Sequence, residues 1–459
     1  MFIDASDRIE GNAPGLHYGM AVVDADGDGR AEVFVTGFGE PNRLLAWEGT
    51  GTAGRLRDTI RPTLADAGRR SIGVAAADVD GDGQEEIYVL NSDAFAGPKM
   101  QSDRLFARFG DHWLDLFAQP QNRSAANQTA GRSVCALDRS GRGIYGFAVA
   151  NYGGPLRLYE IAGGGRIVDV AEDAGIDAMG GGRSLLSLPL VSDRMDLFVG
   201  NEGGPNHLFR NRGDGTFEDV AARLGLADPH AHARGVAPLD AEGEGRFGLV
   251  LGNWEGPHRL FRRAAIATFA DAAPDAFASP SRVRTVIVAD FDNDGHEEIF
   301  VNNIGQPNRL FAWRDDAWVR IDCGDAEEPR GLGTGAVVAD LDGDGRLELL
   351  IAHGESGRQP LALHRPVPNG NGWIRVQPLT AAGAPARGAV VLCRAGGRTQ
   401  ARAVCAGSGY LCQMEPVAHF GLGRTPRVDE IEVRWPTGAA AVVRDPPAGR
   451  LLTVPHPPL

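Results

Sequence analysis

Short apolar runs alternate with acidic, glycine-containing loops along most of the chain, at intervals of 50 to 60 residues. In four places an apolar run precedes the pattern Asp-x-Asp-x-Asp-Gly-x-x-Glu, and a second apolar run follows it. These four loops begin at Asp24, Asp78, Asp290 and Asp340. Short apolar runs bounded by turn residues predict two β-strands joined by each acidic loop.

Three further copies of the loop keep only part of this pattern. They begin at Asp138, Pro189 and Asp240, so the chain holds seven units. Each unit continues with a turn that opens a third strand, and most then carry an aromatic or apolar residue two positions before an Asp, which marks a fourth strand. Four strands in a repeat of about 50 residues are typical of one blade of a β-propeller.

The number of strands predicts how the ring closes. The chain has seven first strands, but only six fourth strands follow them, and Phe2-Ile-Asp4 at the N-terminus carries the seventh fourth-strand signature. We infer that the N-terminal strand completes the last blade, because closure removes the two open edges of the array. The sequence therefore predicts an all-β fold with a seven-bladed propeller.

The acidic loops predict divalent cation sites. Acids at positions one, three, five and nine would converge on one small volume, and two carboxylates about 4 Å apart repel by roughly 4 kcal/mol at an effective dielectric near 20. Hard oxygen ligands and a Gly at the sharp turn favour Ca²⁺, with Mg²⁺ as an alternative occupant, and the other interpretation is a solvated Asp-Gly turn. About four structural Ca²⁺ sites are predicted, with the ligands Asp24, Asp26, Asp28, Glu32, Asp78, Asp80, Asp82, Glu86, Asp290, Asp292, Asp294, Glu298, Asp340, Asp342, Asp344 and Glu348.

Charge and composition narrow the possible partners. Asp and Glu number 60 against 46 Lys and Arg, and the net charge of −14 disfavours nucleic acid and fits cation binding. No long apolar run predicts membrane insertion, and the N-terminus lacks the features of a signal peptide, so the default expectation is a cytoplasmic protein. Five cysteines predict no disulfide framework, although Cys405 and Cys412 could pair.

The repeat units resemble FG-GAP/VCBS repeats, the blades of integrin-α-like propellers. Near the C-terminus, Gly407-Ser-Gly409-Tyr410, His419-Phe-Gly-Leu-Gly423 and Arg434-Trp-Pro-Thr-Gly438 resemble the ASPIC/UnbV domain. Together these stretches make the chain similar to the cartilage-acidic-protein-like family. This resemblance implies a propeller over residues 1–364, a linker over 365–371 and a small β-sandwich-like domain over 372–459. It also implies an extracellular or surface-associated location.

In propellers of this kind the acidic loops lie on one face, so the starts of the first strands lie on the other. Six residues before the first loop position, four consecutive units carry Arg, and the loop after the second strand carries Asn at one equivalent position. Arginines suit carboxylates and phosphates. The alternative is that the arginines pair with acids of the next blade and the asparagines hold turns. The predicted ligand-binding residues are Arg132, Arg183, Arg234, Arg284, Asn151, Asn201, Asn253 and Asn303.

These features favour a non-enzymatic, calcium-binding scaffold that docks an anionic small molecule, a glycan or a protein surface on the arginine and asparagine face. The alternative is an enzyme, such as one of secondary metabolism, that uses the same polar face with His17, His230 or His232 as acid or base. A third possibility is a purely structural propeller. The sequence contains no H-E-x-x-H, G-x-S-x-G or P-loop motif, and the enzyme question stays open with a preference for no catalysis.

Overall fold

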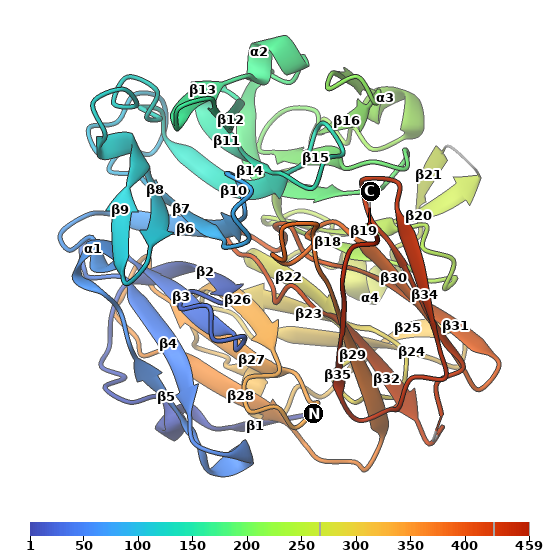
Figure 1. Cartoon of the computed structure of the whole chain (residues 1–459). Helices are drawn as coiled ribbons and strands as arrows, with labels where there is room; N and C mark the ends of the chain where they lie inside the picture. Colours follow the sequence, from blue (N-terminus) through green and yellow to red (C-terminus); the bar gives the residue numbers. More distant parts are fainter. Residues whose placement is uncertain (266–267, 426, 459) are drawn as a thin grey trace.

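The fold is almost entirely antiparallel β-structure in the computed structural model, which describes residues 1–265, 268–425 and 427–458 (Figure 1). Within this part of the chain, the propeller strands form seven sets of four, and each set begins with the strand that precedes an acidic loop. The all-β propeller class predicted from the sequence is confirmed.

The first four sets follow each other along the chain. They consist of β2 (His17–Val23), β3 (Glu32–Gly37), β4 (Arg43–Glu48) and β5 (Arg55–Asp58); β6 (Ser71–Ala77), β7 (Glu86–Asn91), β8 (Arg104–Phe109) and β9 (His112–Asp115); β10 (Gly131–Leu137), β11 (Gly146–Pro155), β12 (Arg157–Ala162) and β13 (Arg166–Asp169); β14 (Met179–Leu188), β15 (Asp196–Asn201), β16 (His207–Asn211) and β17 (Phe217–Asp219). The long strands β11 and β14 also pair with each other, through Tyr152 and Gly181, and join the third and fourth sets into one sheet.

The remaining three sets complete the circle. They consist of β18 (Ala233–Leu239), β19 (Gly248–Asn253), β20 (Arg259–Ala265) and β21 (Thr268–Asp271); β22 (Val283–Ala289), β23 (Glu298–Asn303), β24 (Arg309–Arg314) and β25 (Ala317–Ile321); β26 (Gly333–Ala339), β27 (Glu348–His353), β28 (Ala362–Pro366) and β1 (Phe2–Asp4). Short helices connect strands and sets: α1 (Pro62–Ala65), α2 (Ala171–Ala174), α3 (Ala221–Leu224), α4 (Asp275–Ala278), η1 (Ser6–Arg8), η2 (Gly51–Ala53), η3 (Leu116–Ala118) and η4 (Asp325–Glu327).

The N-terminal strand closes the ring as the sequence predicts. Strand β1 pairs antiparallel with β28, with Ile3 opposite Arg365, and lies at the edge of the last set (Figure 1). Each first strand also contacts the first strand of the next set, in the order β2, β6, β10, β14, β18, β22 and β26, and β26 contacts β2. Apolar side chains fill the space between neighbouring sets; Phe34 of the first set, for example, shares a cluster with Val74 and Phe106 of the second. This burial of apolar surface is the main force that holds the sets together.

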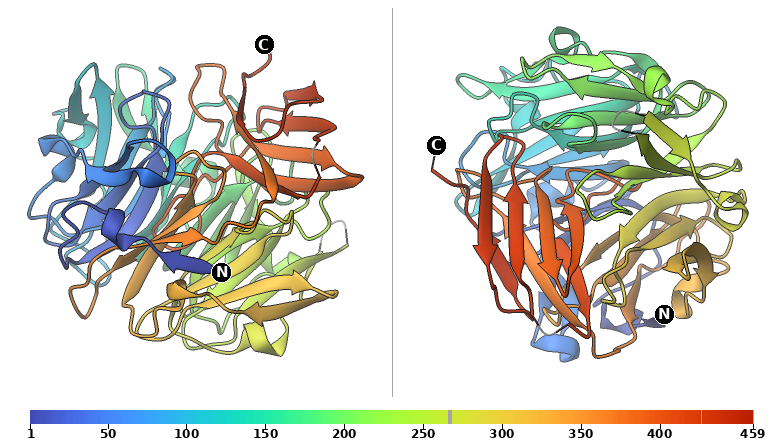
Figure 2. Two further views of the ribbon diagram at one scale, coloured as in Figure 1. Left: turned by 90° about the horizontal axis from the view of Figure 1, so that it is seen from below. Right: turned by 90° about the vertical axis from the view of Figure 1, so that its right-hand side faces the viewer.

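The C-terminal domain, defined here as strands β29–β35, forms two sheets on one side of the ring (Figure 2). Its core holds Ile374, Val391, Phe420 and Trp435, and the two sheets form a β-sandwich-like unit. The boundary at 364 and the linker over 365–371 stay predictions, and β28 runs to Pro366. The strands are β29 (Gly372–Pro378), β30 (Val390–Ala395), β31 (Arg398–Ala403), β32 (Ala418–Gly423), β33 (Glu430–Arg434), β34 (Ala440–Arg444) and β35 (Leu451–Val454).

One segment of the C-terminal domain enters the ring. Residues 405–415, called the channel segment below, lie between β31 and β32 and bond to the first strands of several sets. The Ala136 N–H donates to the Ala406 carbonyl (2.7 Å) and the Val22 N–H to the Gln413 carbonyl (3.0 Å). Because β2 and β10 belong to different sets, the segment lies in the central channel that the first strands surround.

Two remaining expectations concern cysteines and membranes. Cys405 and Cys412, which the sequence allows to pair, are free thiols, as are the other cysteines of the described residues. In the described part of the chain, no helix has the length and apolar character needed to cross a lipid bilayer.

Candidate metal centres and arginine face

Each intact acidic loop folds around its own carboxylates. In the first loop Asp24 accepts hydrogen bonds from the N–H groups of Gly27 (2.8 Å) and Gly29 (2.9 Å), and Glu32 accepts from the Ala25 N–H (2.8 Å). Gly29 has a φ of +85°, which strains any residue with a side chain. The other three loops repeat the bond from Gly to the first Asp and the bond to the last Glu. The repeated Gly and Glu therefore shape the loop and leave further carboxylate oxygens free.

The loops bring most of the predicted metal ligands together. In each loop three carboxylates offer oxygen atoms that all lie within 4.8 Å of one another: Asp24, Asp26 and Glu32; Asp78, Asp80 and Glu86; Asp290, Asp292 and Asp294; and Asp340, Asp342 and Asp344. The remaining predicted ligands, Asp28, Asp82, Glu298 and Glu348, are held in the same loops by hydrogen bonds. The N–H groups of Asp28 and Asp82 donate to Oδ1 of Asp26 and of Asp80, each at 3.1 Å, and Glu298 and Glu348 accept from the N–H groups of Phe291 (3.0 Å) and Leu341 (2.9 Å).

These carboxylates need a counter-charge. Burial, together with repulsion from the neighbouring aspartates, raises the pKa of Glu32 to about 8 and that of Glu86 to about 9. Within the described residues, Oδ1 of Asp290, Oε1 of Glu298 and Oδ1 of Asp340 are buried without a hydrogen-bond partner. Buried, unpaired oxygens around a shared centre fit a divalent cation with hard-oxygen coordination. The four groups of carboxylates could therefore hold metal ions.

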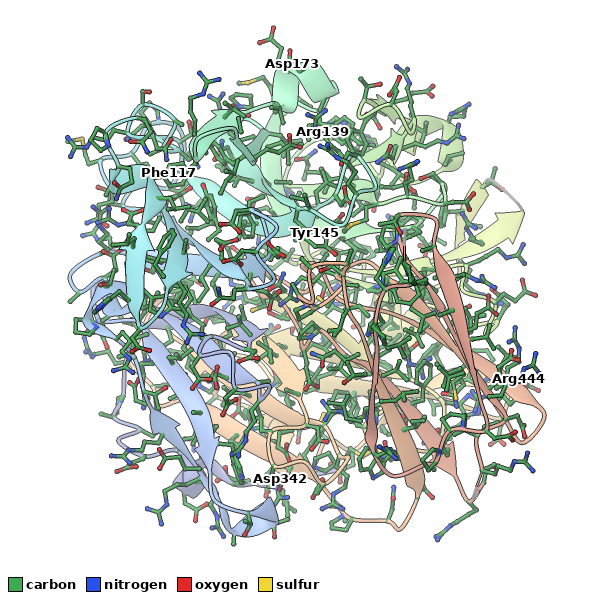
Figure 3. The ribbon with its side chains drawn as sticks, viewed as in Figure 1. Phe117, Arg139, Tyr145, Asp173, Asp342 and Arg444 are labelled. Carbon is green, nitrogen blue, oxygen red and sulfur yellow. The ribbon has the colours of Figure 1, made fainter. Side chains whose placement is uncertain are left out.

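Arginines distinguish two pairs of loops. In the loop at Asp290, Arg314 contacts Oδ2 of Asp292 (3.1 Å) and of Asp294 (3.0 Å). In the loop at Asp340, Arg365 contacts Oδ2 of Asp342 at 2.5 Å, and Figure 3 labels Asp342. We call these the paired loops. We call the loops at Asp24 and Asp78 the unpaired loops, because their predicted metal ligands form one ion pair in the described residues, the exposed contact of Arg30 with Asp28 at 3.8 Å. The ion pair of Arg387 with Glu85, 2.5 Å between Nε and Oε1, involves an acid outside the predicted ligand set.

The C-terminal domain packs directly on the paired loops. The Gly421 N–H donates to Oδ2 of Asp290 (3.0 Å), and Nη1 of Arg375 lies 2.9 Å from Oδ2 of Asp340. Arg375 also pairs with Glu415 of the channel segment. A cavity of about 610 Å³ remains between the loops at Asp24 and Asp340 and this domain. Two of the acids in groups that could hold a metal ion, Asp290 and Asp340, therefore also contact the C-terminal domain.

The degraded loops satisfy their acids with groups of their own loop or of the same set of strands. Asp138 accepts from the N–H groups of Gly141 (2.8 Å) and Gly143 (2.6 Å), as in the intact loops, but it has no acidic partner in its loop. Oδ2 of Asp196 accepts three N–H groups of its own loop, and Glu242 pairs with Arg262 (2.7 Å). None of these loops forms a group of three carboxylates in the part of the chain that the structure describes.

The four predicted arginines, Arg132, Arg183, Arg234 and Arg284, gather at the end of the first strands that lies away from the acidic loops. We call this surface the arginine face. Arg183 and Arg234 share Glu202, at 2.5 Å for Nε of Arg183 and 2.7 Å for Nη2 of Arg234, and Arg284 pairs with Glu355. Arg132 instead donates to the backbone carbonyl of Ala94 (3.2 Å) and to that of Phe95. Arg183 and Arg234 are each 4% exposed and Arg284 is 7% exposed. The pairing with acids that the sequence allowed is thus present for three of the four arginines.

Aromatic rings and a tyrosine of the channel segment complete the arginine face. The guanidinium carbon of Arg183 lies 4.2 Å from the centre of the Tyr152 ring, and that of Arg284 lies 4.3 Å from the Trp254 ring. Tyr410 is 6% exposed, and its ring centre lies 5.9 Å from the same carbon of Arg284. Sequence reasoning missed Tyr410, because the only signal was its place in the Gly407-Ser-Gly-Tyr410 stretch.

The charges around Tyr410 act on its hydroxyl. Burial alone would raise the pKa of this phenol, but the positive charges of the four arginines outweigh burial and hold it below its ordinary value. The four contributors are Arg183, Arg284, Arg234 and Arg132. The arginine face is therefore electropositive at its centre, inside a protein whose net charge is −14.

The predicted asparagines hold turns. Each is at most 3% exposed, and each donates its side-chain N–H to a proline carbonyl four residues later, at 2.6 to 2.8 Å: Asn151 to Pro155, Asn201 to Pro205, Asn253 to Pro257 and Asn303 to Pro307. The three candidate histidines lie in different settings. His17 is buried, with Nδ1 3.2 Å from the Thr36 carbonyl, whereas His230 and His232 are exposed. The asparagine side chains are therefore engaged within turns, and ligand binding at this face stays a prediction that concerns the arginines.

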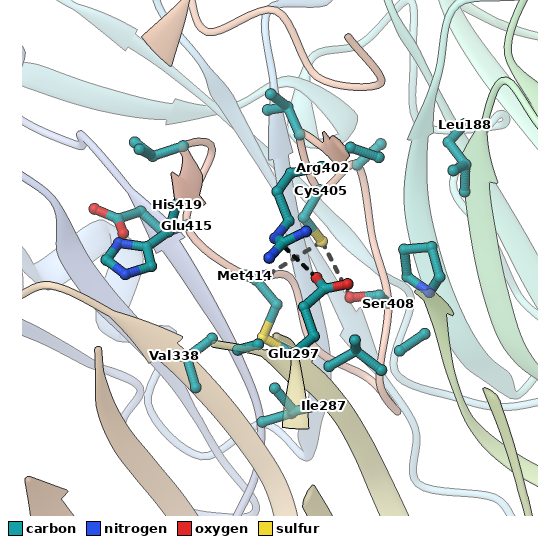
Figure 4. A pocket seen from close by; sticks show the side chains of 18 of the residues that line it. Leu188, Ile287, Glu297, Val338, Arg402, Cys405, Ser408, Met414, Glu415 and His419 are labelled. Atoms are coloured by element: carbon teal, nitrogen blue, oxygen red, sulfur yellow. Dashed lines mark hydrogen bonds and ion pairs between the residues drawn. The ribbon is translucent and has the colours of Figure 1, made fainter. Parts of the chain in front are cut away.

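A small cavity lies on the other side of the channel segment (Figure 4). It measures about 100 Å³, and it is lined by apolar side chains such as Leu188 and Ile287 together with the ion pair of Arg402 and Glu297 at 3.1 Å. Pockets for small molecules usually measure at least about 300 Å³. This cavity is too small to serve as a ligand pocket.

Comparison with known proteins covers both parts of the chain. A family model described as FG-GAP-like repeat matches residues 14–89, and one described as ASPIC and UnbV matches residues 380–458. Cartilage acidic protein 1 of Homo sapiens is 43% identical over 464 residues, which cover 94% of this chain and 70% of the human protein. The Xenopus tropicalis protein of the same name is 43% identical over 480 residues, covering 95% of this chain and 74% of its own length.

Solved structures share the fold at low sequence identity. The BP39L lectin from Burkholderia pseudomallei superposes with a TM-score of 0.52 at 14% identity and covers 77% of this chain and 98% of the lectin. BBS1N, solved in complex with ARL6DN, gives a TM-score of 0.50 at 10% identity over 80% of this chain and 97% of its own. At these identities the likeness concerns the fold alone.

Proposed function

The chain belongs to the cartilage acidic protein 1 family, and from this premise we propose that it is a non-enzymatic, calcium-loaded scaffold that docks an anionic ligand or partner on its arginine face. The observation that carries this proposal is the placement of four guanidiniums at one end of the channel, where they form ion pairs with two carboxylates of the described residues, Glu202 and Glu355. The surplus of positive charge calls for an anion.

Calcium is the proposed occupant of the four intact loops. Three carboxylates whose oxygens lie within 4.8 Å of one another supply the ligand type that Ca²⁺ prefers in each loop. Mg²⁺ is the alternative, but it demands nearly ideal octahedral geometry, whereas these irregular loops suit the more flexible coordination of Ca²⁺. The bound ion would tie the first strand of a set to its second strand.

A binding role is favoured over catalysis because, in the described residues, no side-chain hydrogen bond links His17, His230 or His232 to the arginines or to Glu202. His17 is buried and bonded to a backbone carbonyl, and His230 and His232 lie on the exposed surface. An enzyme needs its acid or base within hydrogen-bond reach of the reacting group. An enzyme that uses the arginine face remains the alternative function, and it would need a proton-transfer group other than these histidines.

An extracellular location fits this proposal. Calcium sites with dissociation constants of about 10⁻⁴ to 10⁻³ M are typical of extracellular modules and fill only at the high calcium concentrations outside cells. Two proteins that share the fold are a lectin and a component of a protein complex. A glycan or a protein surface is therefore a suitable partner beside a small anionic molecule.

A thermal-shift screen tests the docking face. Small anionic metabolites and sulfated glycans are added to the full chain in the presence of Ca²⁺, and at least one is expected to raise the melting temperature. The double variant Arg183→Ala/Arg234→Ala should abolish that shift. Arg444→Ala is the matched control, because Arg444 lies on the outer edge of the C-terminal domain with 78% of its side chain exposed (Figure 3).

Two outcomes would count against the scaffold. If every anion left the melting temperature unchanged, docking on the arginine face would be rejected. If a shift survived in the double variant, the ligand would bind elsewhere on the molecule.

A further inference from the structure

We propose that Tyr410 completes an oxyanion-binding site with Arg132, Arg183, Arg234 and Arg284, so that the C-terminal domain supplies one contact of the arginine face. The ligand group is a single carboxylate or phosphate. This inference rests on the proposed docking function and adds to it the chemical class of the bound group and the residue from the second domain.

The channel segment is built to hold Tyr410 in one place. Gly409 exchanges two backbone hydrogen bonds with Val236, at 2.9 and 2.7 Å, and the carbonyl of Leu411 accepts from the Val74 N–H (3.3 Å). These bonds flank Tyr410 on both sides and attach it to two different sets of the ring. A β-carbon on Gly409 would come within 2.7 Å of the Thr285 side chain, so the segment fits only with glycine at this position.

The arginines keep binding capacity that the protein itself does not use. Arg132 contacts no carboxylate in the described residues, and the buried Nε atoms of Arg132 and Arg234 have no hydrogen-bond partner there. Buried guanidiniums with unused N–H groups are unfavourable unless an anion or water satisfies them. An oxyanion would accept from these donors and balance the surplus charge.

Tyr410 supplies a hydroxyl donor beside these arginines, with its ring centre 5.9 Å from the guanidinium carbon of Arg284. Its hydroxyl has no hydrogen-bond partner among the described residues, whereas the buried hydroxyl of Tyr145 donates to the Arg387 carbonyl (2.9 Å). Because the arginines hold the pKa of Tyr410 below its ordinary value, its O–H is a strong donor to an anion. A bound oxyanion would reverse that effect and raise the pKa of the phenol.

The surroundings favour a planar or tetrahedral oxyanion attached to a larger body. Arginine forks match the geometry of carboxylate and phosphate oxygens. At the rim, Phe95 is 68% exposed, and the guanidinium carbons of Arg132 and Arg183 lie 5.2 and 5.3 Å from its ring centre. This exposed ring can contact the apolar part of a molecule whose acidic group enters the site. The oxyanion can come from a free metabolite or from an acidic polypeptide.

The experiment measures binding of inorganic phosphate, acetate and an acetylated tri-glutamate peptide to the calcium-loaded full chain by titration calorimetry. Tyr410→Phe and Arg132→Gln should each weaken binding by about tenfold, as expected for the loss of one hydrogen bond to a charged group. Tyr18→Phe, which removes another hydroxyl near Arg132 and Arg284, should change binding by less than about twofold. Tighter binding of the peptide than of acetate would identify a polypeptide as the source.

A spectroscopic measurement separates ligand contact from a purely structural role. In a titration to alkaline pH, the phenolate absorbance that wild type shows and Tyr410→Phe lacks should appear at a higher pH when phosphate is present, because a bound anion disfavours the ionised phenol. The melting curve of each variant shows whether it is folded, and Arg132→Gln tests the same site without altering the channel segment.

Equal binding of the probes to wild type and Tyr410→Phe would overturn this inference while leaving docking on the arginine face intact. Absence of binding of all three probes to wild type would overturn it as well. The scaffold function would then be judged by the screen with larger anions described above.

Discussion

The acidic face, which carries the four intact loops, and the arginine face differ in how their charges are paired. On the acidic face, Glu32 and Glu86 are buried beside aspartates without a basic partner in the described residues. On the arginine face, Glu202 contacts both Arg183 and Arg234. Both faces arise from the ends of the same first strands, so the repeat that creates one charge cluster also creates the other. The acidic face carries far more unbalanced charge than the arginine face. We therefore expect its stability to depend on ions from solution, while two carboxylates of the chain, Glu202 and Glu355, offset part of the positive charge on the arginine face.

The acidic face itself is not uniform. Arg314 and Arg365 place a guanidinium against the carboxylates of the paired loops, and the position that Arg314 takes in its set is held by Glu48 in the first set. An internal cation can substitute in part for a metal ion. We expect the unpaired loops to depend most strongly on calcium.

Removal of calcium should have the largest effect. A site that is filled at a hundred times its dissociation constant stabilises the folded state by about 2.7 kcal/mol, and several such sites act together. Chelation should therefore lower the melting temperature by about 10 °C or more. The measurement is a calorimetric scan with and without chelator, with added Mg²⁺ as the control for ion type. An unchanged melting temperature would contradict the metal sites and the contrast between the faces.

A residue near the arginine face should make the stability of the folded protein depend on pH. Burial lowers the pKa of His258 to about 4, and Nδ1 of His258 accepts the Asn253 N–H (3.0 Å). The unfolded chain binds a proton at a pKa of about 6.5, so the folded state loses stability as the pH falls from 6.5 towards 4. Between pH 7 and pH 5 the loss from this histidine is about 2 kcal/mol.

The variant His258→Asn isolates this contribution. Asn42, Asn206 and Asn308 occupy the same position in other sets and accept the same backbone bond, so asparagine can replace the imidazole without a titrating group. The difference in unfolding free energy between variant and wild type should grow in favour of the variant as the pH is lowered. A difference that stays constant with pH would show that His258 does not titrate as inferred.

The features of this molecule that the sequence predicts are those that repeat along the chain. The seven units, the pairing of the N-terminal strand with the last set and the grouping of acids follow from patterns within about ten residues or from a register that repeats. Asn151 and its equivalents were ambiguous, because an amide at a turn can bind either a ligand or a backbone carbonyl. Only the bonds to Pro155 and the other prolines show the second role.

Contacts between distant segments could not be predicted in this way. Tyr410 reaches Arg132 and Arg284 because the C-terminal domain docks on the acidic face and sends its channel segment through the ring. No periodicity links residue 410 to residue 132. In the same way, the contact of Arg365 with Asp342 depends on the pairing of β28 with β27 and on a rotamer, and the residue type alone does not reveal it.

The smallest expected effect tests whether an internal cation substitutes for the metal. Arg365→Gln removes the guanidinium from Asp342 and Asp344, and in chelator this should cost about 1 kcal/mol, because 15% of the Arg365 side chain is exposed and water can enter. With calcium bound, the ion balances the same carboxylates, so the cost should fall to less than half. Arg30→Gln, beside Asp28 of an unpaired loop, is the matched control and should have almost no effect in either state, because the Arg30 side chain is 75% exposed. An equal cost of Arg365→Gln with and without calcium would mean that arginine and metal act independently, and the division into paired and unpaired loops would then have no energetic meaning.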